Sequence, residues 1–292
     1  MTRLDSTTFR LRKALQHIED HLEEALTVER LSEVAALSKY HFHRQFSQRF
    51  GIGVYKYIQL VRLRRASYQL AFRPHMRIID IALACGYESH EAFTRAFRRN
   101  FTQAPSEFRD RPQWQAWHST CSALNQLRSE QLLRAPAASS VQLRNFPETR
   151  SAVLPHRGDP ALLGESLRRF IEWRRENRLP PARSATFNLL YDDPGDTPPE
   201  HFRLDLCVAT EAAVAANRHG VVPYTIPAGR CAVLRHVGPD DTLGSSLRYL
   251  YGEWLPQSGE TLRDFPPFLQ RLSFLPDLPE YELTSDIFLP LA

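Results

Sequence analysis

This chain of 292 residues contains few cysteines, only two methionines and no long apolar run. Its four cysteines are scattered and form no CxxC pair, which argues against a disulfide framework or a zinc site and favours a reducing, cytoplasmic location. Because no run of about 18 apolar residues occurs, no membrane span is expected. The N-terminal residues also lack the basic-then-apolar order of a signal peptide.

The motifs of the common enzyme classes are missing as well. The sequence has no Gly-x-Ser-x-Gly nucleophile elbow, no phosphate-binding loop, no dinucleotide fingerprint and no histidine cluster with metal-ligand spacing. We therefore expect no catalytic residue, no cofactor and no metal, and we interpret the chain first as a binding protein.

Acidic residues are missing from one long stretch. Between Glu33 and Asp80 there is none, whereas nine basic residues occur. Residues 1–118 carry 19 Lys and Arg against 12 Asp and Glu, a net charge of +7, and residues 119–292 carry 18 against 21, a net charge of −3. A solvated face with chance clustering would also explain such a run, but a polyanionic partner such as DNA is the better explanation for its length.

A short apolar helix, a tight turn and a second helix occur twice in the basic part. Downstream, Gly86 supplies the turn because glycine tolerates positive φ, and Ser89 can cap the second helix. Upstream, Ser38 is the corresponding cap. Both second helices carry phenylalanines at i, i+4 and i+8, namely Phe42, Phe46 and Phe50 and, at an offset of 51, Phe93, Phe97 and Phe101. This is the helix-turn-helix pattern.

A long helix over Val54–Ala71, ended by Pro74, is expected to join the two copies. At about 1.5 Å per residue it spans roughly 25–27 Å, which is shorter than the ~34 Å pitch of DNA. Two recognition helices at its ends could enter successive major-groove segments if the duplex bends. One chain could then read what a symmetric dimer normally reads.

The phenylalanine stripes determine which face of each second helix is free for DNA. Arg44 and Arg95 could donate to guanine, and Glu91 could accept from cytosine N4. For any one of these residues, a merely solvated side chain is the alternative. The full expected set is Tyr40, His43, Arg44, His90, Glu91, Thr94 and Arg95 for bases, and Lys39, Lys56 and Arg98 for phosphates.

A second repeat occupies residues 141–292. Ala152-Val153-Leu154-x-His156-x-Gly158 and Leu163-Gly164-x-Ser166-Leu167-Arg168 recur at an offset of 80, with ten identities over seventeen positions. Each unit is predicted to be strand, helix and two strands, and two such units could form an antiparallel sheet backed by two helices, with a groove between them. The equivalence of His156 and His236 indicates a structural role for both.

Around the two helix-turn-helix copies the chain contains Leu31, Ser38-Lys39-Tyr40-His41-Phe42-His43-Arg44-Gln45-Phe46, Arg62-Leu63-Arg64-Arg65-Ala66, Ile81-Ala82, Gly86-Tyr87-Glu88-Ser89, Phe93-Thr94-Arg95-Ala96-Phe97 and Pro105-Ser106-Glu107-Phe108-Arg109. In these residues, the stretch from about 9 to 111 resembles the DNA-binding domain of the AraC/XylS family of transcription regulators. Ala36 departs from it, because the family usually has glycine in that turn.

Residues 141–292 resemble the GyrI-like effector-binding domain. The resemblance rests on the duplicated motif, Trp254-Leu255-Pro256-x-Ser258-Gly259, Pro267-Phe268 and Asp286-Ile287-Phe288-Leu289-Pro290. Similar domains bind small, often cationic or aromatic molecules in a central groove. Some resemble small-molecule hydrolases instead.

Two residues depart from that family pattern, because Leu269 and Arg271 stand where it has an acid and a tyrosine. Without the acid a buried organic cation loses its counter-charge. Glu253 could replace the acid, and an inward-facing Arg271 would favour an anionic or neutral ligand. The expected pocket residues are Phe187, Tyr191, Tyr251, Glu253, Trp254, Phe268 and Arg271, although such aromatic residues could equally be core.

The sequence thus predicts an all-α N-terminal domain with two helix-turn-helix motifs joined by a long helix, and an α+β C-terminal domain of two repeated β-α-β-β units. The expected limits are 1–111 for the DNA-binding domain, 112–140 for a linker with a helix over 119–134, and 141–292 for the effector domain. The expected function is a transcription regulator that binds double-stranded DNA and senses a small molecule, with RNA polymerase as a further candidate partner. A hydrolase fused to a DNA-binding domain and a constitutive regulator whose second half binds a protein are the alternatives.

Overall fold

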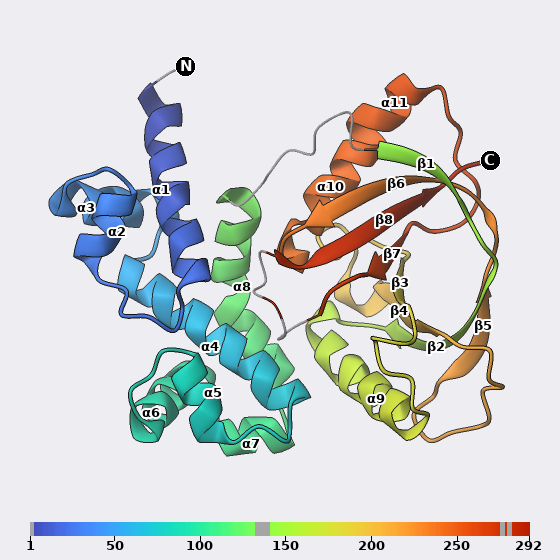
Figure 1. The fold of residues 1–292 in the computed structure, drawn as a ribbon, viewed down its shortest axis with the longest axis horizontal. Coiled ribbons are helices and arrows are strands. Elements are labelled where there is room, and N and C mark those ends of the chain that lie inside the picture. Colours follow the sequence, from blue (N-terminus) through green and yellow to red (C-terminus); the bar gives the residue numbers. More distant parts are fainter. Residues whose placement is uncertain (1–2, 132–140, 275–277, 279–281) are drawn as a thin grey trace. The chain divides into compact units, whose positions relative to one another are not determined.

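The computed structural model describes residues 3–131, 141–274, 278 and 282–292. These residues fall into two compact units, the first built from residues before 132 and the second from residues after 140 (Figure 1). Within the described residues, no helix is long and apolar enough to cross a membrane, and no group of three or more histidine, cysteine, aspartate or glutamate side chains could hold a metal ion.

The described part of the first unit is entirely helical. Its helices are α1 (Arg3–Asp20), α2 (Val28–Val34), α3 (Lys39–Phe50), α4 (Val54–Phe72), α5 (Ile78–Ala84), α6 (His90–Phe101), α7 (Pro105–Asp110) and α8 (Trp114–Gln131). The expected caps are present, since the Ser38 hydroxyl accepts from the His41 N–H and the Ser89 hydroxyl from the Ala92 N–H. The two predicted helix-turn-helix motifs and the long helix between them are confirmed.

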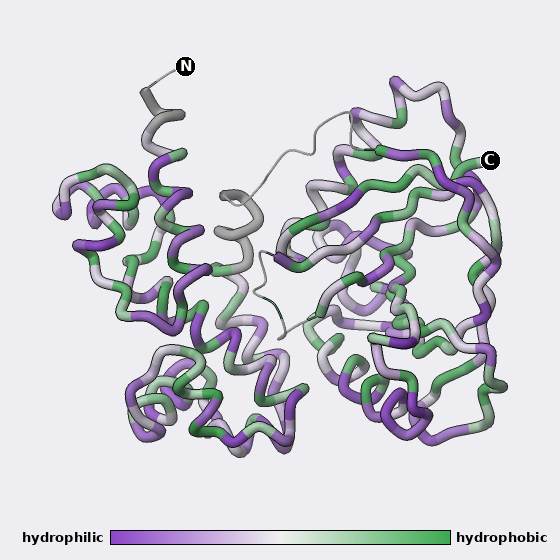
Figure 2. Tube along the Cα trace, in the orientation of Figure 1, coloured by the Kyte–Doolittle hydropathy of each residue, from purple (hydrophilic) through white to green (hydrophobic). Residues whose placement is uncertain are grey.

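Two apolar clusters hold the helical unit together, and α4 contributes to both. Phe42, Phe46 and Phe50 pack in the first cluster, which also contains Tyr57 of α4. Phe93, Phe97 and Phe101 pack in the second, together with Leu70 of α4. Polar and apolar residues alternate along α3 and α6 (Figure 2), so each of these two helices buries its phenylalanine stripe and leaves the opposite side in solvent, whereas α4 is buried on most sides.

Helix α8 lies where a linker was expected. It begins at Trp114, five residues before the predicted start, and Trp114, Trp117 and Cys121 are buried in the second cluster. Leu124 reaches the first cluster. Because these apolar side chains are covered by the other helices, residues 114–124 pack as part of the helical unit. The rest of the expected linker, residues 132–140, lies outside the described residues.

The second unit contains one eight-stranded antiparallel sheet. Its strands are β1 (Val141–Phe146), β2 (Thr149–Arg157), β3 (Thr186–Leu190), β4 (Arg203–Ala209), β5 (Val222–Ile226), β6 (Gly229–Val237), β7 (Phe268–Arg271) and β8 (Thr284–Pro290), in the order β1-β6-β8-β7-β3-β4-β2-β5. Between β2 and β3 lie the turn η2 (Pro160–Leu162) and helix α9 (Leu163–Glu176), and η3 (Pro199–His201) precedes β4. Between β6 and β7 lie η4 (Asp240–Thr242), α10 (Leu243–Tyr249), the π-helical turn η5 (Leu250–Trp254) and α11 (Leu255–Ser258).

Each repeat has one strand more than predicted, and the repeats exchange these strands. Strand β1 precedes the first repeat but pairs with β6 of the second, whereas β5 precedes the second repeat and pairs with β2 of the first. The centre of the sheet is the pair β3–β7, where the two repeats meet. Most side chains of β1 and β5 are exposed, because these two strands form the edges of the sheet.

The two faces of the sheet have different cover. Helix α9 packs on one face against Leu154 and Leu206, and α10 packs on the same face against Leu234 and Leu269. The opposite face, which we call the inner face, lies within the curl of the sheet (Figure 1). Its aromatic cluster contains Phe146, Phe187, Phe268 and Phe288, with Tyr191, Tyr224 and Phe265 partly buried at its margin.

Candidate DNA-binding surface and effector-binding face

Helix α3 presents the side chains predicted for DNA contact to solvent. Tyr40 is 86% exposed although it is a large aromatic residue, and His43 and Arg44 are exposed as well. The adjacent Phe42 and Phe46 are fully buried. Burial of the phenylalanine stripe therefore turns an aromatic ring, an imidazole and a guanidinium outward from one helix, and these groups suit base edges in a major groove.

Lys39, a predicted phosphate contact at the start of α3, already has an anionic partner. Its ammonium group donates a hydrogen bond to Glu29 of α2, and the two form an ion pair at the surface. This contact lowers the pKa of Glu29 and raises the pKa of Lys39. A phosphate at this position would have to replace the Glu29 carboxylate.

Helix α6 exposes fewer of the predicted contact groups. His90, Arg95 and Arg98 are exposed, but the hydroxyl of Thr94 is buried, and among the described residues it has no hydrogen-bond partner. The Thr94 hydroxyl is thus turned away from the surface where a base would lie. Glu91 is exposed, and hydrogen bonds from its own N–H and from the Ser89 hydroxyl lower its pKa. Glu91 therefore also helps to cap the N-terminus of α6.

Lys56 connects the start of α4 to the end of α6. Its ammonium group donates to Asn100 Oδ1 over 2.6 Å, and the side chain is exposed. Because Asn100 is a neutral partner, the charge of Lys56 remains available to a phosphate.

The downstream turn is packed against the loop between α1 and α2. Arg62 of α4 donates from Nε to the Leu22 carbonyl over 2.8 Å and from Nη2 to the Glu24 carbonyl over 2.7 Å. Gly86 has a φ of +72°, and a Cβ built on it would lie 2.4 Å from the Leu22 oxygen and 2.5 Å from Arg62 Nη2. Only glycine allows this approach. The contact ties the downstream turn to the loop that precedes the upstream helix-turn-helix motif, in addition to the link through α4.

The upstream turn adopts the same backbone conformation without glycine. Ala36 has a φ of +51°, and the N–H of Leu37 bonds to the Ser32 carbonyl, as the N–H of Tyr87 bonds to the Ala82 carbonyl downstream. A left-handed conformation costs an alanine about 1–2 kcal/mol. The departure at Ala36 is therefore accommodated with local strain, and the turn itself is preserved.

The seven residues predicted to line a ligand groove do not gather at one place. Phe187 and Phe268 lie on the inner face, with ring centroids 6.3 Å apart, and Tyr191 lies at the margin of the same cluster. Trp254 instead packs with the cluster below α10, on the opposite face. Tyr251 and Glu253 are exposed on the π-helical turn η5.

The positions of Leu269 and Arg271 correct the sequence-based argument about ligand charge. Leu269 is fully buried among the residues below α10, because it lies one position from Phe268 and side chains alternate along a strand. Arg271 shares the face of Leu269, donates to Asn188 Oδ1 over 2.8 Å and pairs with Asp240. Neither residue faces the inner cluster, so neither determines the charge that the inner face offers.

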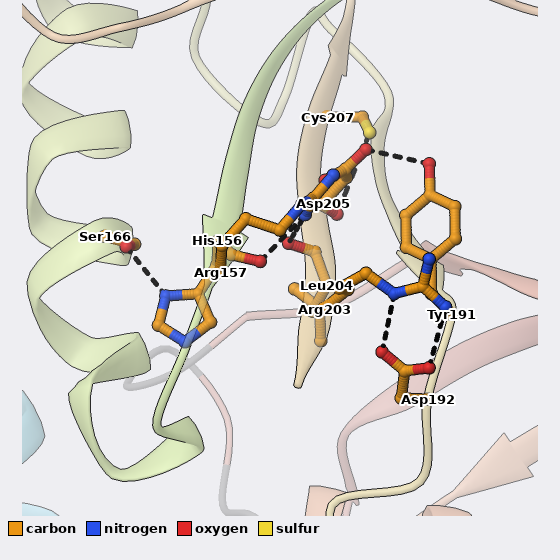
Figure 3. A network of polar contacts seen from close by, with 9 residues as sticks. All are labelled: His156, Arg157, Ser166, Tyr191, Asp192, Arg203, Leu204, Asp205 and Cys207. Atoms are coloured by element: carbon orange, nitrogen blue, oxygen red, sulfur yellow. Dashed lines mark hydrogen bonds and ion pairs between the residues drawn. The ribbon is translucent and has the colours of Figure 1, made fainter. Parts of the chain in front are cut away.

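Two carboxylates on the inner face were missed by the sequence analysis. Asp205 of β4 accepts from the Tyr191 hydroxyl over 2.9 Å and from Arg157 Nη1 over 2.7 Å (Figure 3). Asp286 of β8 accepts from Nε and Nη2 of Arg235 over 2.8 and 2.9 Å. Burial and the neighbouring Asp205 raise the pKa of Tyr191, so its phenol stays protonated. The sequence contained a signal for these two carboxylates, because each is the single acidic residue of an otherwise apolar strand, at the same place in its repeat.

The repeated histidines have equivalent surroundings. His156 Nδ1 lies 2.9 Å from Ser166 Oγ of α9, and His236 Nδ1 lies 2.9 Å from Ser246 Oγ of α10. Figure 3 shows His156 turned toward α9. Burial lowers the pKa of both histidines. Each histidine thus fastens the end of a strand to the helix that follows it.

Comparisons with known proteins agree with both halves of the chain. The family model of the GyrI-like small molecule binding domain matches residues 139–292, and that of a helix-turn-helix domain matches residues 31–111. The probable transcriptional regulator YgiV of Escherichia coli (strain K12) is 39% identical over 153 residues, which are 52% of this chain and 96% of YgiV.

Two further relatives match the helix-turn-helix part. The uncharacterized HTH-type transcriptional regulator YbfP of Bacillus subtilis (strain 168) is 42% identical over 99 residues, 34% of this chain and 33% of YbfP. The right origin-binding protein of Escherichia coli (strain K12) is 35% identical over 109 residues, 37% of each chain. The chain thus spans about a third of the length of these two proteins. With a GyrI-like domain over more than half of its length and an AraC-type helix-turn-helix domain before it, the chain belongs to the GyrI-like family and is an AraC-type DNA-binding transcription regulator.

Proposed function

We propose that this regulator contacts DNA through α3 and α6 of its helical unit and senses a small molecule on the inner face of the sheet in its second unit. The burial of both phenylalanine stripes carries the DNA assignment, because it leaves Arg44 and Arg95 at equivalent exposed positions on the two helices. Each guanidinium can donate two hydrogen bonds to one guanine.

The other basic residues have a supporting role in this proposal. Lys56 and Arg98 bind phosphates, which strengthens binding without selecting a sequence. Lys39 joins them by exchanging Glu29 for a phosphate oxygen. His43 and Tyr40 contact base edges or a thymine methyl group, and His90 does so from α6. Thr94 has no direct contact because its hydroxyl is buried.

Affinity measurements on the full chain test the DNA assignment. A binding site is first selected from a pool of random duplexes, and its affinity is then measured by fluorescence anisotropy at several salt concentrations. Arg44→Ala and Arg95→Ala should each cost about 1–3 kcal/mol, or about 5- to 150-fold in affinity. Lys56→Ala should instead lower the slope of the salt dependence by about one.

Lys13→Ala is the matched control for these variants. Lys13 is exposed on α1, outside both recognition helices, so its removal should leave the affinity nearly unchanged. If Arg44→Ala and Arg95→Ala bind as tightly as the Lys13 variant, the proposed contacts are wrong.

The sensing role rests on the aromatic inner face, where Phe187 and Phe268 form a buried floor and Tyr191 and Tyr224 a partly buried margin. A ligand regulates DNA binding only if it binds one of two states of the protein more tightly. A thermal-shift screen of the full chain against cationic, neutral and anionic aromatic compounds, followed by DNA affinity with each hit, measures this coupling. A screen without any hit would contradict the sensing role.

We propose no catalytic activity. The carboxylates of the inner face, Asp205 and Asp286, are each neutralised by an ion pair with an arginine, so neither is an unpaired general base for hydrolysis. Turnover of a hit from the screen would restore the hydrolase alternative. A second half that binds a protein would be supported if the screen fails and a partner such as RNA polymerase protects the inner face from modification.

A further inference from the structure

The ion pairs of the inner face expose their bases and bury their acids. The Asp205 side chain is 4% exposed and its partner Arg157 48%, while Asp286 is 7% exposed and its partner Arg235 55%. Asp192, which follows Tyr191, is 15% exposed against 53% for Arg203. A molecule that approaches these pairs therefore meets guanidinium groups first, although each pair is neutral as a whole.

This arrangement is unfavourable for an organic cation. A cation buried against an apolar face needs a carboxylate that is not already neutralised. Asp205 already accepts from Arg157 and Tyr191, and Asp286 already accepts two hydrogen bonds from Arg235. A cation would have to displace an arginine from one of them, and it would be repelled by the exposed guanidinium groups on the way.

The surroundings of Tyr191 suit an anion instead. The guanidinium carbons of Arg157 and Arg203 each lie 5.4 Å from the centroid of the Tyr191 ring. Within the described residues, every hydrogen bond of the Arg157 guanidinium is made by Nη1, and those of Arg203 are made by Nε and Nη2 to Asp192. Arg157 Nη2 and Arg203 Nη1 therefore keep donors for the oxygens of a ligand, next to an aromatic ring.

We propose that the effector is an aromatic anion, such as a carboxylate, whose ring packs on Tyr191 and the inner aromatic cluster and whose charge is bound by Arg157 and Arg203. This inference rests on the sensing role proposed above and assigns the class of ligand. Only the first repeat provides this site, because Leu272, Val237 and Thr284 occupy in the second repeat the positions of Tyr191, Arg157 and Arg203.

Three probes of one shape and different charge test the inference on the full chain by calorimetry. They are 1-naphthoate, 1-naphthylmethylammonium and the neutral 1-naphthalenemethanol. We expect naphthoate to bind at least about 10-fold more tightly than the other two, because charge-assisted hydrogen bonds contribute most of the discrimination. Arg203→Gln should weaken naphthoate by about 10-fold or more and leave the neutral probe unchanged.

Arg150→Gln is the matched control. Arg150 lies on β2, in an exposed pair with Glu211 on the other face, and its loss should leave the affinity of naphthoate unchanged. Preference for the ammonium probe, or equal binding of naphthoate by the Arg203 and Arg150 variants, would overturn the inference while the sensing role stands. If none of the three probes binds, the inference is overturned as well, whereas the sensing role fails only if the broader thermal-shift screen also finds no ligand. Circular dichroism of each variant shows whether the fold is retained.

Discussion

Replacement of Gly86 by alanine should destabilise the helical unit by about 3–7 kcal/mol. The left-handed φ of +72° alone would cost about 1–2 kcal/mol. About half of that strain is offset, because alanine also restricts the unfolded chain by about 0.4–1 kcal/mol. The contact decides the outcome, since a Cβ 2.4 Å from the Leu22 oxygen and 2.5 Å from Arg62 Nη2 cannot be accommodated in place. Arg62 must move, and it then loses two charge-assisted hydrogen bonds of about 1.5–3 kcal/mol each.

Urea denaturation followed by circular dichroism at the helical band measures this loss. With a slope of about 1–3 kcal/mol per molar urea, the transition of the helical unit should move down by about 1 M or more. A loss below about 1 kcal/mol would refute the reasoning, because the backbone strain would then be the whole effect.

Ala36→Gly is the matched control for this prediction and should change stability in the opposite direction. Ala36 is exposed and has the same left-handed conformation, with a φ of +51°. Glycine removes strain of about 1–2 kcal/mol and restores about 0.4–1 kcal/mol of freedom to the unfolded chain, so a gain of about 0.5–1 kcal/mol is expected. A destabilised Ala36→Gly protein would show that the turn is not strained.

Three further predictions concern the second unit. Arg174 is buried and donates to two carbonyls and a hydroxyl, so Arg174→Met should cost about 2–4 kcal/mol in urea denaturation, and an unchanged midpoint would contradict its role. Asp205→Asn removes the charged partner of Arg157 and should lower the free energy of unfolding by about 1–3 kcal/mol. An unchanged free energy of unfolding would show that the pair is only a surface contact. Burial lowers the pKa of His156 and His236 from 6.5, so the unfolded chain binds more protons than the folded one below that pH. The stability that depends on these histidines is complete above pH 6.5 and is lost as the pH falls, and the double variant His156→Gln/His236→Gln should flatten this dependence.

Local chemistry made the helical unit predictable. Helix α3 runs over Lys39–Phe50, because the predicted cap Ser38 starts it and Gly51, with a φ of +69°, ends it. The start of α8 was not predictable in the same way. Trp114 and Trp117 look like part of an irregular segment until the other helices cover them, so tertiary burial and not local propensity makes that helix.

In the second unit, the sequence did not predict the pairing of the strands or the face on which each side chain lies. The duplicated motif revealed two repeats, but not the exchange of β1 and β5, since pairing between distant strands leaves no local pattern. Leu269 was read as an inner position although it faces α10. A shift of one residue along a strand moves a side chain to the other face, and only the structure shows which face the helix covers.

The exchanged strands make each repeat the completion of the other. A half-length ancestor with one repeat could have built this sheet only by giving its first strand to a second copy, as a dimer with twofold symmetry. In a dimer, the association of the two repeats depends on the protein concentration. In one chain, each repeat meets the other at an effective concentration of about 1 mM or more. It also releases the halves from symmetry, so that Tyr191 could arise in one repeat while Leu272 remained in the other. A symmetric ancestor would have had to carry the same residues twice, whereas the two halves of the fused chain can differ.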